Sequence, residues 1–117
     1  MKLYGVRVFV DDIDISTRFY RDVLGLKVNW SMGEMQAAGF DLGNAELIIE
    51  QAARDGADGD LVGRFAGVSL QVEDIEKTHA DWQAGGVEFT QAPQAQPWGG
   101  TLAHFKDPSG NILTLLG

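Results

Sequence analysis

Hydrophobic and polar residues alternate in two short segments, one near the start of each half of the chain. Residues 5–10 read GVRVFV and residues 67–72 read GVSLQV, with apolar side chains at every second position. A period of two is typical of a β-strand with one buried face. The two segments lie at equivalent places in a longer repeat, because Asp12 and Asp74 follow them 62 residues apart (74 − 12 = 62). One folding unit is therefore predicted to occur twice.

A short amphipathic helix is predicted after each of these strands. The first begins at Asp12 or Asp14, whose side chain can accept hydrogen bonds from free backbone N–H groups, and ends at Gly25. Its apolar positions recur at helical spacing, at Ile15, Phe19, Val23 and Leu24. The second helix begins at Asp74 and ends at Gly85–Gly86, with Ile75 and Trp82 as its apolar positions. Each helix must cover a sheet.

Three further strands are predicted after each helix. In the first unit they span residues 27–30, 34–40 and 45–51, and in the second 87–91, 101–106 and 112–116. Both units thus read βαβββ. We expect an α+β fold in which two tandem βαβββ modules form a curved mixed sheet with a concave pocket. The single domain spans residues 1–117, with module one at about 1–51, a linker at about 52–65 and module two at about 66–117.

Composition restricts the function. The chain of 117 residues has a formal net charge of −8, no cysteine and no long apolar run. Nucleic acid and membrane are therefore not expected partners, and we expect a soluble, cytoplasmic protein. Disulfides and thiolate metal sites are excluded. The linker holds Asp55, Asp58 and Asp60, but their spacing is not that of a calcium-binding loop, so we assign them no chemistry.

Two motifs carry a family resemblance. Residues 12–26 read DIDISTRFYRDVLGL and residues 107–111 read DPSGN. They resemble the D-[LI]-x-x-S-x-x-F-Y-x-x-x-L-G-[LF] and D-P-[DS]-G-N motifs of the vicinal oxygen chelate superfamily, which includes glyoxalase I, bleomycin resistance proteins and extradiol dioxygenases. The resemblance implies a pocket on the concave face of the sheet and a homodimer. It covers essentially the whole chain.

Metal-dependent members of that family hold one divalent cation on the first and fourth strands of the units. Carried over to this sequence, the ligand positions are Gly5, Glu50, Gly67 and Thr114. Only Glu50 can bind a metal, whereas a catalytic site generally has about three protein ligands. We therefore predict no metal and no other cofactor.

Strand parity then predicts which side chains share the pocket face with these positions. Parity adds Arg7, Phe9, Glu46 and Gln71 to Glu50 and Thr114. The resemblance adds His104 and Trp98, because family members have a substrate-contacting side chain and a P-W-G segment at similar positions, and these eight residues are the candidate ligand-binding residues. Arg7 and Glu50 either neutralise each other or receive a charged ligand. Trp98 is an aromatic wall or a loop anchor, and Trp30 invites the same two interpretations. His79 is interpreted as a surface or packing residue.

Two functions compete. The first is a metal-independent small-molecule binding protein of the bleomycin-resistance type, which sequesters a ligand in a dimer pocket and confers antibiotic resistance. The second is a glyoxalase-like lyase or dioxygenase whose metal is held by displaced ligands, with His104 and Glu50 as candidates. Metal-free acid–base catalysis by either residue, and a purely structural role, are also open at this point. The identity of the ligand, the occurrence of any reaction, the sharing of the pocket between chains and strand swapping are not determined by the sequence.

Overall fold

Nine strands and two α-helices make up the fold, and the computed structural model describes all residues from 1 to 117. The first unit contains β1 (Gly5–Val10), α1 (Ile13–Arg18), the π-helical turn η1 (Phe19–Val23), β2 (Val28–Met32), β3 (Ala37–Asp41) and β4 (Glu46–Gln51). The second unit follows a 3₁₀ turn, η2 (Gly59–Leu61). It contains β5 (Phe65–Gln71), α2 (Ile75–Ala84), β6 (Glu88–Phe89), β7 (Gln94–Ala95), β8 (Thr101–Lys106) and β9 (Ile112–Leu116).

The strands form two mixed sheets, one in each unit. The first has the order β1-β4-β3-β2 and the second β5-β9-β8-β6, with β7 also paired to β8. The first strand of each unit pairs in parallel with the last, and the other pairs are antiparallel. The predicted α+β fold of two βαβββ units is confirmed. β1 and β5 are each an edge strand.

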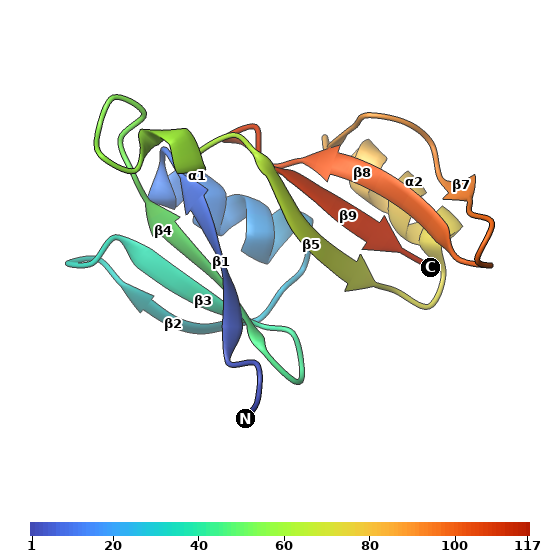
Figure 1. Cartoon of the computed structure of the whole chain (residues 1–117), viewed down its shortest axis with the longest axis horizontal. Helices are drawn as coiled ribbons and strands as arrows, with labels where there is room; N and C mark the ends of the chain where they lie inside the picture. The colour runs from blue at the N-terminus through green and yellow to red at the C-terminus, as the bar shows by residue number, and fades with distance from the viewer.

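Figure 1 shows how the two sheets meet. β1 and β5 are the inner strands, they lie closest at the C-terminal end of β1, and they diverge from there. At the close end Val62, just before β5, forms an isolated parallel bridge with Phe9. The helices lie behind the sheets in this view, and α2 is fixed there by the edge-to-face contact of Trp82 with Phe105. One face of each sheet therefore stays free of helices.

The first helix differs from its prediction. Asp12 rather than Asp14 is the N-cap and accepts from the backbone N–H of Ile15. The predicted apolar stripe is partly wrong, because Ile15 is 46% exposed while Ser16 and Tyr20 are fully buried. The buried positions then continue to Leu24. The wider π turn, in which the Leu24 N–H donates to the carbonyl of Phe19, carries the buried face to Leu24.

The second helix follows its prediction closely. Asp74 caps it by accepting from the Lys77 N–H, Ile75 is buried and the chain turns at Gly85. Two segments that were expected to be irregular contain short elements, η2 in the predicted linker and β7 in the loop before β8. The predicted strand at 87–91 is shorter, and the one at 34–40 begins only at Ala37. A backbone with positive φ at Gln36 ends the turn before it.

The hydrophobic core lies between the helices and the inner faces of both sheets. It is one cluster that includes Val8 and Leu47 from the first unit and Val68 and Leu113 from the second. The alternation in the sequence predicted these buried faces correctly. None of the helices is long and apolar enough to span a membrane.

Candidate functional site

The predicted site residues of the strands lie on the sheet faces that the helices leave uncovered, which we call the open faces. Along β1, Arg7 is exposed and Phe9 is half-buried, whereas the alternating residues Val8 and Val10 are buried. β4 is less regular, because Glu46 and Glu50 are half-buried but Ile48 between them is buried together with Leu47 and Ile49. The predicted division of the faces agrees with burial along β1, whereas Ile48 on β4 and Thr114 on β9, which parity places on the open faces, are buried. The ligand role of these residues stays a prediction.

Arg7 and Glu50 form an ion pair on the open face of the first sheet. The Arg7 Nε and Nη2 atoms donate to the same Glu50 oxygen, Oε2, at 3.0 and 2.8 Å. The guanidinium also lies over the Phe9 ring, with Cζ 5.4 Å from the ring centroid. The hydrogen bond to Glu50 raises the pKa of Arg7. Both side chains remain in contact with water, so a charged ligand can exchange with either partner at modest cost.

Glu46 is held by a different set of donors. Its Oε1 accepts from the indole Nε1 of Trp30 at 3.0 Å and its Oε2 from the amide of Asn29 at 2.8 Å. The bond from Trp30, followed by that from Asn29, lowers the pKa of Glu46. The Trp30 ring lies directly over Gly39, where a Cβ would overlap it. Trp30 therefore packs on the sheet, its role as an aromatic wall for a ligand stays a prediction, and Glu46 is a fixed carboxylate.

His104 and Thr114 meet on the open face of the second sheet. They are cross-strand partners on β8 and β9, and His104 Nδ1 lies 2.8 Å from Thr114 Oγ1. Phe65, at the start of β5, contacts the His104 ring edge-to-face at 5.7 Å and is 59% exposed. Sequence reasoning missed Phe65 because it placed this residue in the linker. Its position two residues before Gly67, on the same strand face, could have identified it.

The remaining candidates lie elsewhere. Trp98 lies in the turn between β7 and β8, is 65% exposed and covers Gly100, where a Cβ would overlap its ring. Gln71 lies at the end of β5 and lines a cavity between the two units. His79 packs on Phe89 with ring centroids 4.3 Å apart, which confirms the packing interpretation. The chain's four cavities are lined by none of Arg7, Phe9, Glu50, Trp98, His104 and Thr114.

The four family ligand positions do not fit a divalent cation. A Cβ at Gly5 would lie 2.8 Å from the Glu46 carbonyl oxygen, and the φ of +70° at Gly67 is one that other residues rarely adopt. β5 is also irregularly registered against β9 between Phe65 and Ser69. Glu50 is bound to Arg7, and Thr114 is a neutral hydroxyl. No group of three or more His, Asp or Glu residues is arranged to hold a metal ion.

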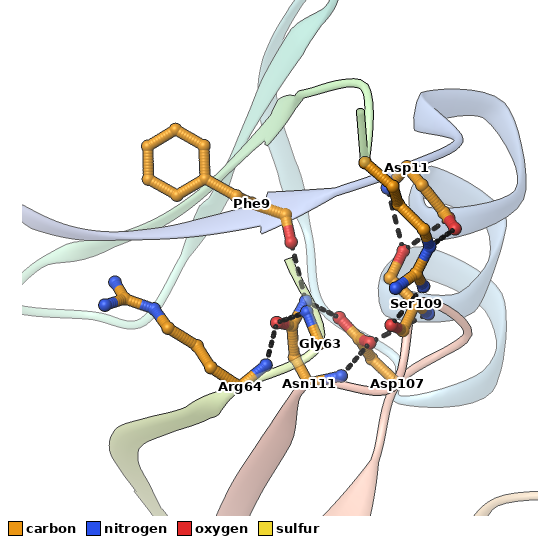
Figure 2. A network of polar contacts seen from close by, with 8 residues as sticks. Phe9, Asp11, Gly63, Arg64, Asp107, Ser109 and Asn111 are labelled. Carbon is orange, nitrogen blue, oxygen red and sulfur yellow. Dashed lines mark hydrogen bonds and ion pairs between the residues drawn. The ribbon is translucent and has the colours of Figure 1, made fainter. Parts of the chain in front are cut away.

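A buried polar network joins the two units behind the open faces, and the DPSGN turn is at its centre. Figure 2 shows Asn111 between β1 and the segment before β5. Its amide donates to the Phe9 carbonyl at 2.7 Å and to Asp107 at 3.0 Å, while its oxygen accepts from the N–H groups of Gly63 and Arg64. Asn111 is 1% exposed. The sequence predicted only a turn here.

Ser109 and Arg54 extend the network to the end of β1. The Ser109 hydroxyl donates to Asp11 at 2.8 Å and accepts from the Asp11 N–H, and Arg54 binds both Asp11 and the Ser109 carbonyl. The predicted linker, which supplies Arg54, therefore has a structural role. Tyr20 completes the set by donating its hydroxyl to Asp107 Oδ2 at 2.8 Å. Burial raises the pKa of Tyr20 further above its ordinary range.

The pKa values of Asp107 and Asp11 are expected to be shifted in opposite directions. Burial raises the pKa of Asp107 above the ordinary 3.8, although hydrogen bonds from Asn111, Tyr20 and two backbone N–H groups favour its charged form. Hydrogen bonds from Ser109 and Arg54 lower the pKa of Asp11. A ¹³C NMR titration of the side-chain carboxyls should give a higher midpoint for Asp107 than for Asp11. The reverse order would contradict the assignment.

These two pKa shifts make the stability of the fold depend on pH in opposite senses. The folded protein binds the Asp107 proton more tightly than the unfolded chain does, so this group stabilises the fold below the unfolded pKa. That contribution is lost as the pH rises through the folded pKa of Asp107. Asp11 acts in the opposite sense, because its stabilisation is present above the unfolded pKa and is lost as the pH falls through its lowered folded pKa.

Comparison with known proteins identifies the family. The Glyoxalase/Bleomycin resistance protein/Dioxygenase superfamily matches residues 3–115. The chain belongs to this superfamily. A crystal structure of a superfamily member from Sphaerobacter thermophilus DSM 20745 superposes with a TM-score of 0.82 at 26% identity, covering 99% of this chain and 96% of that one. The resemblance of the two motifs to the superfamily is thereby confirmed.

Three relatives in the superfamily align with nearly the whole chain. YraH of Bacillus subtilis (strain 168) is 33% identical over 98% of this chain and 97% of its own. A probable lactoylglutathione lyase of Synechocystis sp. is 31% identical over 99% of this chain and 95% of its own. A bleomycin resistance protein of Klebsiella pneumoniae is 27% identical over 90% of this chain and 83% of its own. These relatives thus include a probable enzyme and a resistance protein.

Proposed function

We propose that this protein binds a cationic small molecule between the open faces of two chains and sequesters it without a metal and without chemical change. The observation that carries the proposal is the composition of the open faces. Glu46 and Glu50 are two carboxylates held in place by neighbouring side chains, and Phe9 and Phe65 are aromatic rings with exposed surface. Carboxylates and aromatic faces together favour a cation with an apolar or planar body.

A second chain is part of the proposal. Arg7, Phe9, Glu50 and Phe65 line no cavity of the single chain, and Glu46 lines only one of about 240 Å³, so a small molecule bound among them would remain largely in water. Small-molecule sites usually bury most of the ligand surface, which a second open face would achieve here. The similarity to the bleomycin resistance protein of Klebsiella pneumoniae supports a resistance role. The proposal includes a cytoplasmic location, where a bound antibiotic is kept from its target.

The test is a fluorescence titration with three antibiotic classes. Trp30 lies on the first sheet and is hydrogen-bonded to Glu46, so a ligand on this face should change tryptophan emission. Bleomycin, mitomycin C and phenazine are added separately, and sedimentation velocity measures the assembly state in parallel. We expect saturable binding of bleomycin, the cationic compound of the three, by a dimer, and weaker binding of the two uncharged compounds. The absence of binding by all three would overturn the proposal.

A lactoylglutathione-lyase-like enzyme is the second candidate, and the Synechocystis relative supports it. Such an enzyme would need a metal held by displaced ligands, for example His104 and Glu50. Those two side chains are bound to Thr114 and Arg7. Elemental analysis after incubation with manganese, iron, nickel and zinc separates the candidates. Stoichiometric metal that is lost on replacing His104 and Glu50 together would favour the enzyme.

A further inference from the structure

The two units are joined at one end of β5 and separated at the other. At the N-terminal end of β5, Asn111 binds both the Phe9 carbonyl and the backbone of Gly63. At the C-terminal end the strands diverge, as Figure 1 shows for β1 and β5. Residues of both units line a cavity of about 610 Å³ there, the largest in the chain. We call it the inter-unit cleft.

The walls of the inter-unit cleft combine apolar side chains with polar groups in similar measure. Leu26 and Leu42 come from the first unit, and Leu70, Val72 and Trp82 come from the second. These five side chains are half-buried and pack against the core cluster with part of their surface. Their remaining surface borders the cleft. A volume in this range is typical of cavities that bind drug-sized molecules, about 300–1,000 Å³.

Asp41 is the one charged side chain among the residues that line the cleft. Asp41, Asn44, Ser69 and Gln71 complete its lining, and no Lys, Arg or His is among the lining residues. One Asp41 oxygen, Oδ1, accepts from the Gly43 N–H at 2.7 Å, which leaves Oδ2 available to a ligand. Asp41 also lies near enough to Glu46 for their charges to interact. An amine would be stabilised at this position and a carboxylate disfavoured.

The edge of β5 adds hydrogen-bonding groups. β5 is the outermost strand of its sheet and pairs only with β9. Alternate backbone N–H and C=O groups along its other edge therefore have no strand partner. Ser69 and Gln71 lie on this part of β5 and line the cleft. A ligand with an apolar body and one or two polar groups can satisfy them.

The geometry points to a second binding site in the inter-unit cleft for an amphiphilic amine, with a ring or short alkyl body against Leu70 and Trp82 and a protonated nitrogen at Asp41. This site is distinct from the proposed one between two chains, although Gln71, which was predicted on the pocket face, lines it. Arg7, Glu50 and His104 take no part in it. A protein that holds a cation on its open faces can thus hold another between its units.

The experiment uses three probes of nearly equal shape and different charge. 1-Naphthylmethylamine is cationic at pH 7, 1-naphthylmethanol is neutral and 1-naphthoate is anionic. Each is titrated into ¹⁵N-labelled full-length protein and followed by amide and indole NMR shifts. We expect the amine to shift the residue 69–72 amides and the Trp82 indole, the alcohol to shift the same signals more weakly, and the naphthoate to shift none.

Two variants test the assignment. Asp41→Asn keeps the acceptor for the Gly43 N–H and removes the charge. It should therefore weaken the binding of the amine about 10-fold and leave the affinity for the alcohol unchanged. Asp60→Asn, an exposed acid outside the cleft, is the matched control and should change neither. Three outcomes would each overturn the proposal: no NMR shifts with any probe, shifts confined to Arg7, Glu50 and His104, or equal binding of all three probes. So would an Asp41→Asn variant that binds the amine as tightly as the unmodified protein.

Discussion

Replacing Asn111 with alanine is expected to lower the free energy of unfolding by about 3–5 kcal/mol. The side chain is almost fully buried and satisfies polar groups in three separate segments: the Phe9 carbonyl, the Gly63 and Arg64 N–H groups and the Asp107 carboxylate. Alanine leaves these groups in place without their partner. An unsatisfied buried donor or acceptor costs about 1–3 kcal/mol, and at least two are created here.

Urea denaturation followed by tryptophan fluorescence measures this change. Asn44→Ala is the matched control, because Asn44 is exposed and makes no hydrogen bond within the protein, and its effect should stay within about 0.5 kcal/mol. A loss below about 1 kcal/mol for Asn111→Ala would mean that the DPSGN segment acts only as a local turn. A large loss would show that this one side chain couples the stability of the two units.

Local sequence patterns predicted the parts of the fold that depend on neighbours along the chain. The alternation in GVRVFV placed Val8 and Val10 in the core and Arg7 on the open face. Asp74 was identified as a helix cap because its carboxylate can reach the Lys77 N–H three residues on. These features rest on contacts within a few residues. The family motifs added the arrangement of the two units.

Features that depend on distant segments escaped prediction. Ile15 was assigned to the buried stripe by a regular helical period, and the π turn at Phe19–Val23 was not recognisable from residue types. Arg54 was assigned to a linker without a role, but it binds Asp11, 43 residues earlier, and Ser109, 55 residues later. Phe65 was missed because the strand containing it begins two residues earlier than the alternating pattern.

The candidate site was predicted in outline. Parity along the strands placed Glu46, Glu50 and Thr114 on the open faces and the resemblance added His104, and the structure adds which partner each one has. Partner choice depends on side-chain direction and on neighbours such as Gly39, whose missing Cβ makes room for the Trp30 ring. The predicted concave pocket is not enclosed by one chain. This is why the proposed ligand site needs a second copy.

Replacing Glu50 with glutamine is expected to weaken bleomycin binding about 10- to 100-fold, while the fold stays intact. Glutamine keeps the shape of the side chain but loses the charge that would receive a ligand amine. A charge-assisted hydrogen bond contributes about 1.5–3 kcal/mol, which corresponds to this range. Stability should change little, because the ion pair with Arg7 is exposed to water. Isothermal titration calorimetry measures the affinity and urea denaturation the stability.

Replacing Arg7 is expected to change the affinity for bleomycin in the opposite direction. In the free protein its guanidinium occupies one of the two Glu50 oxygens, Oε2, and its positive charge repels a cation. Arg7→Gln should therefore bind bleomycin more tightly than the unmodified protein, and both effects should shrink as salt is raised. Glu73→Gln, which removes an exposed carboxylate outside the open faces, should leave the affinity unchanged. Equal affinities for Glu50→Gln and the unmodified protein would exclude Glu50 as the cation-binding group and leave Glu46, held by Trp30 and Asn29, as the remaining carboxylate of that face.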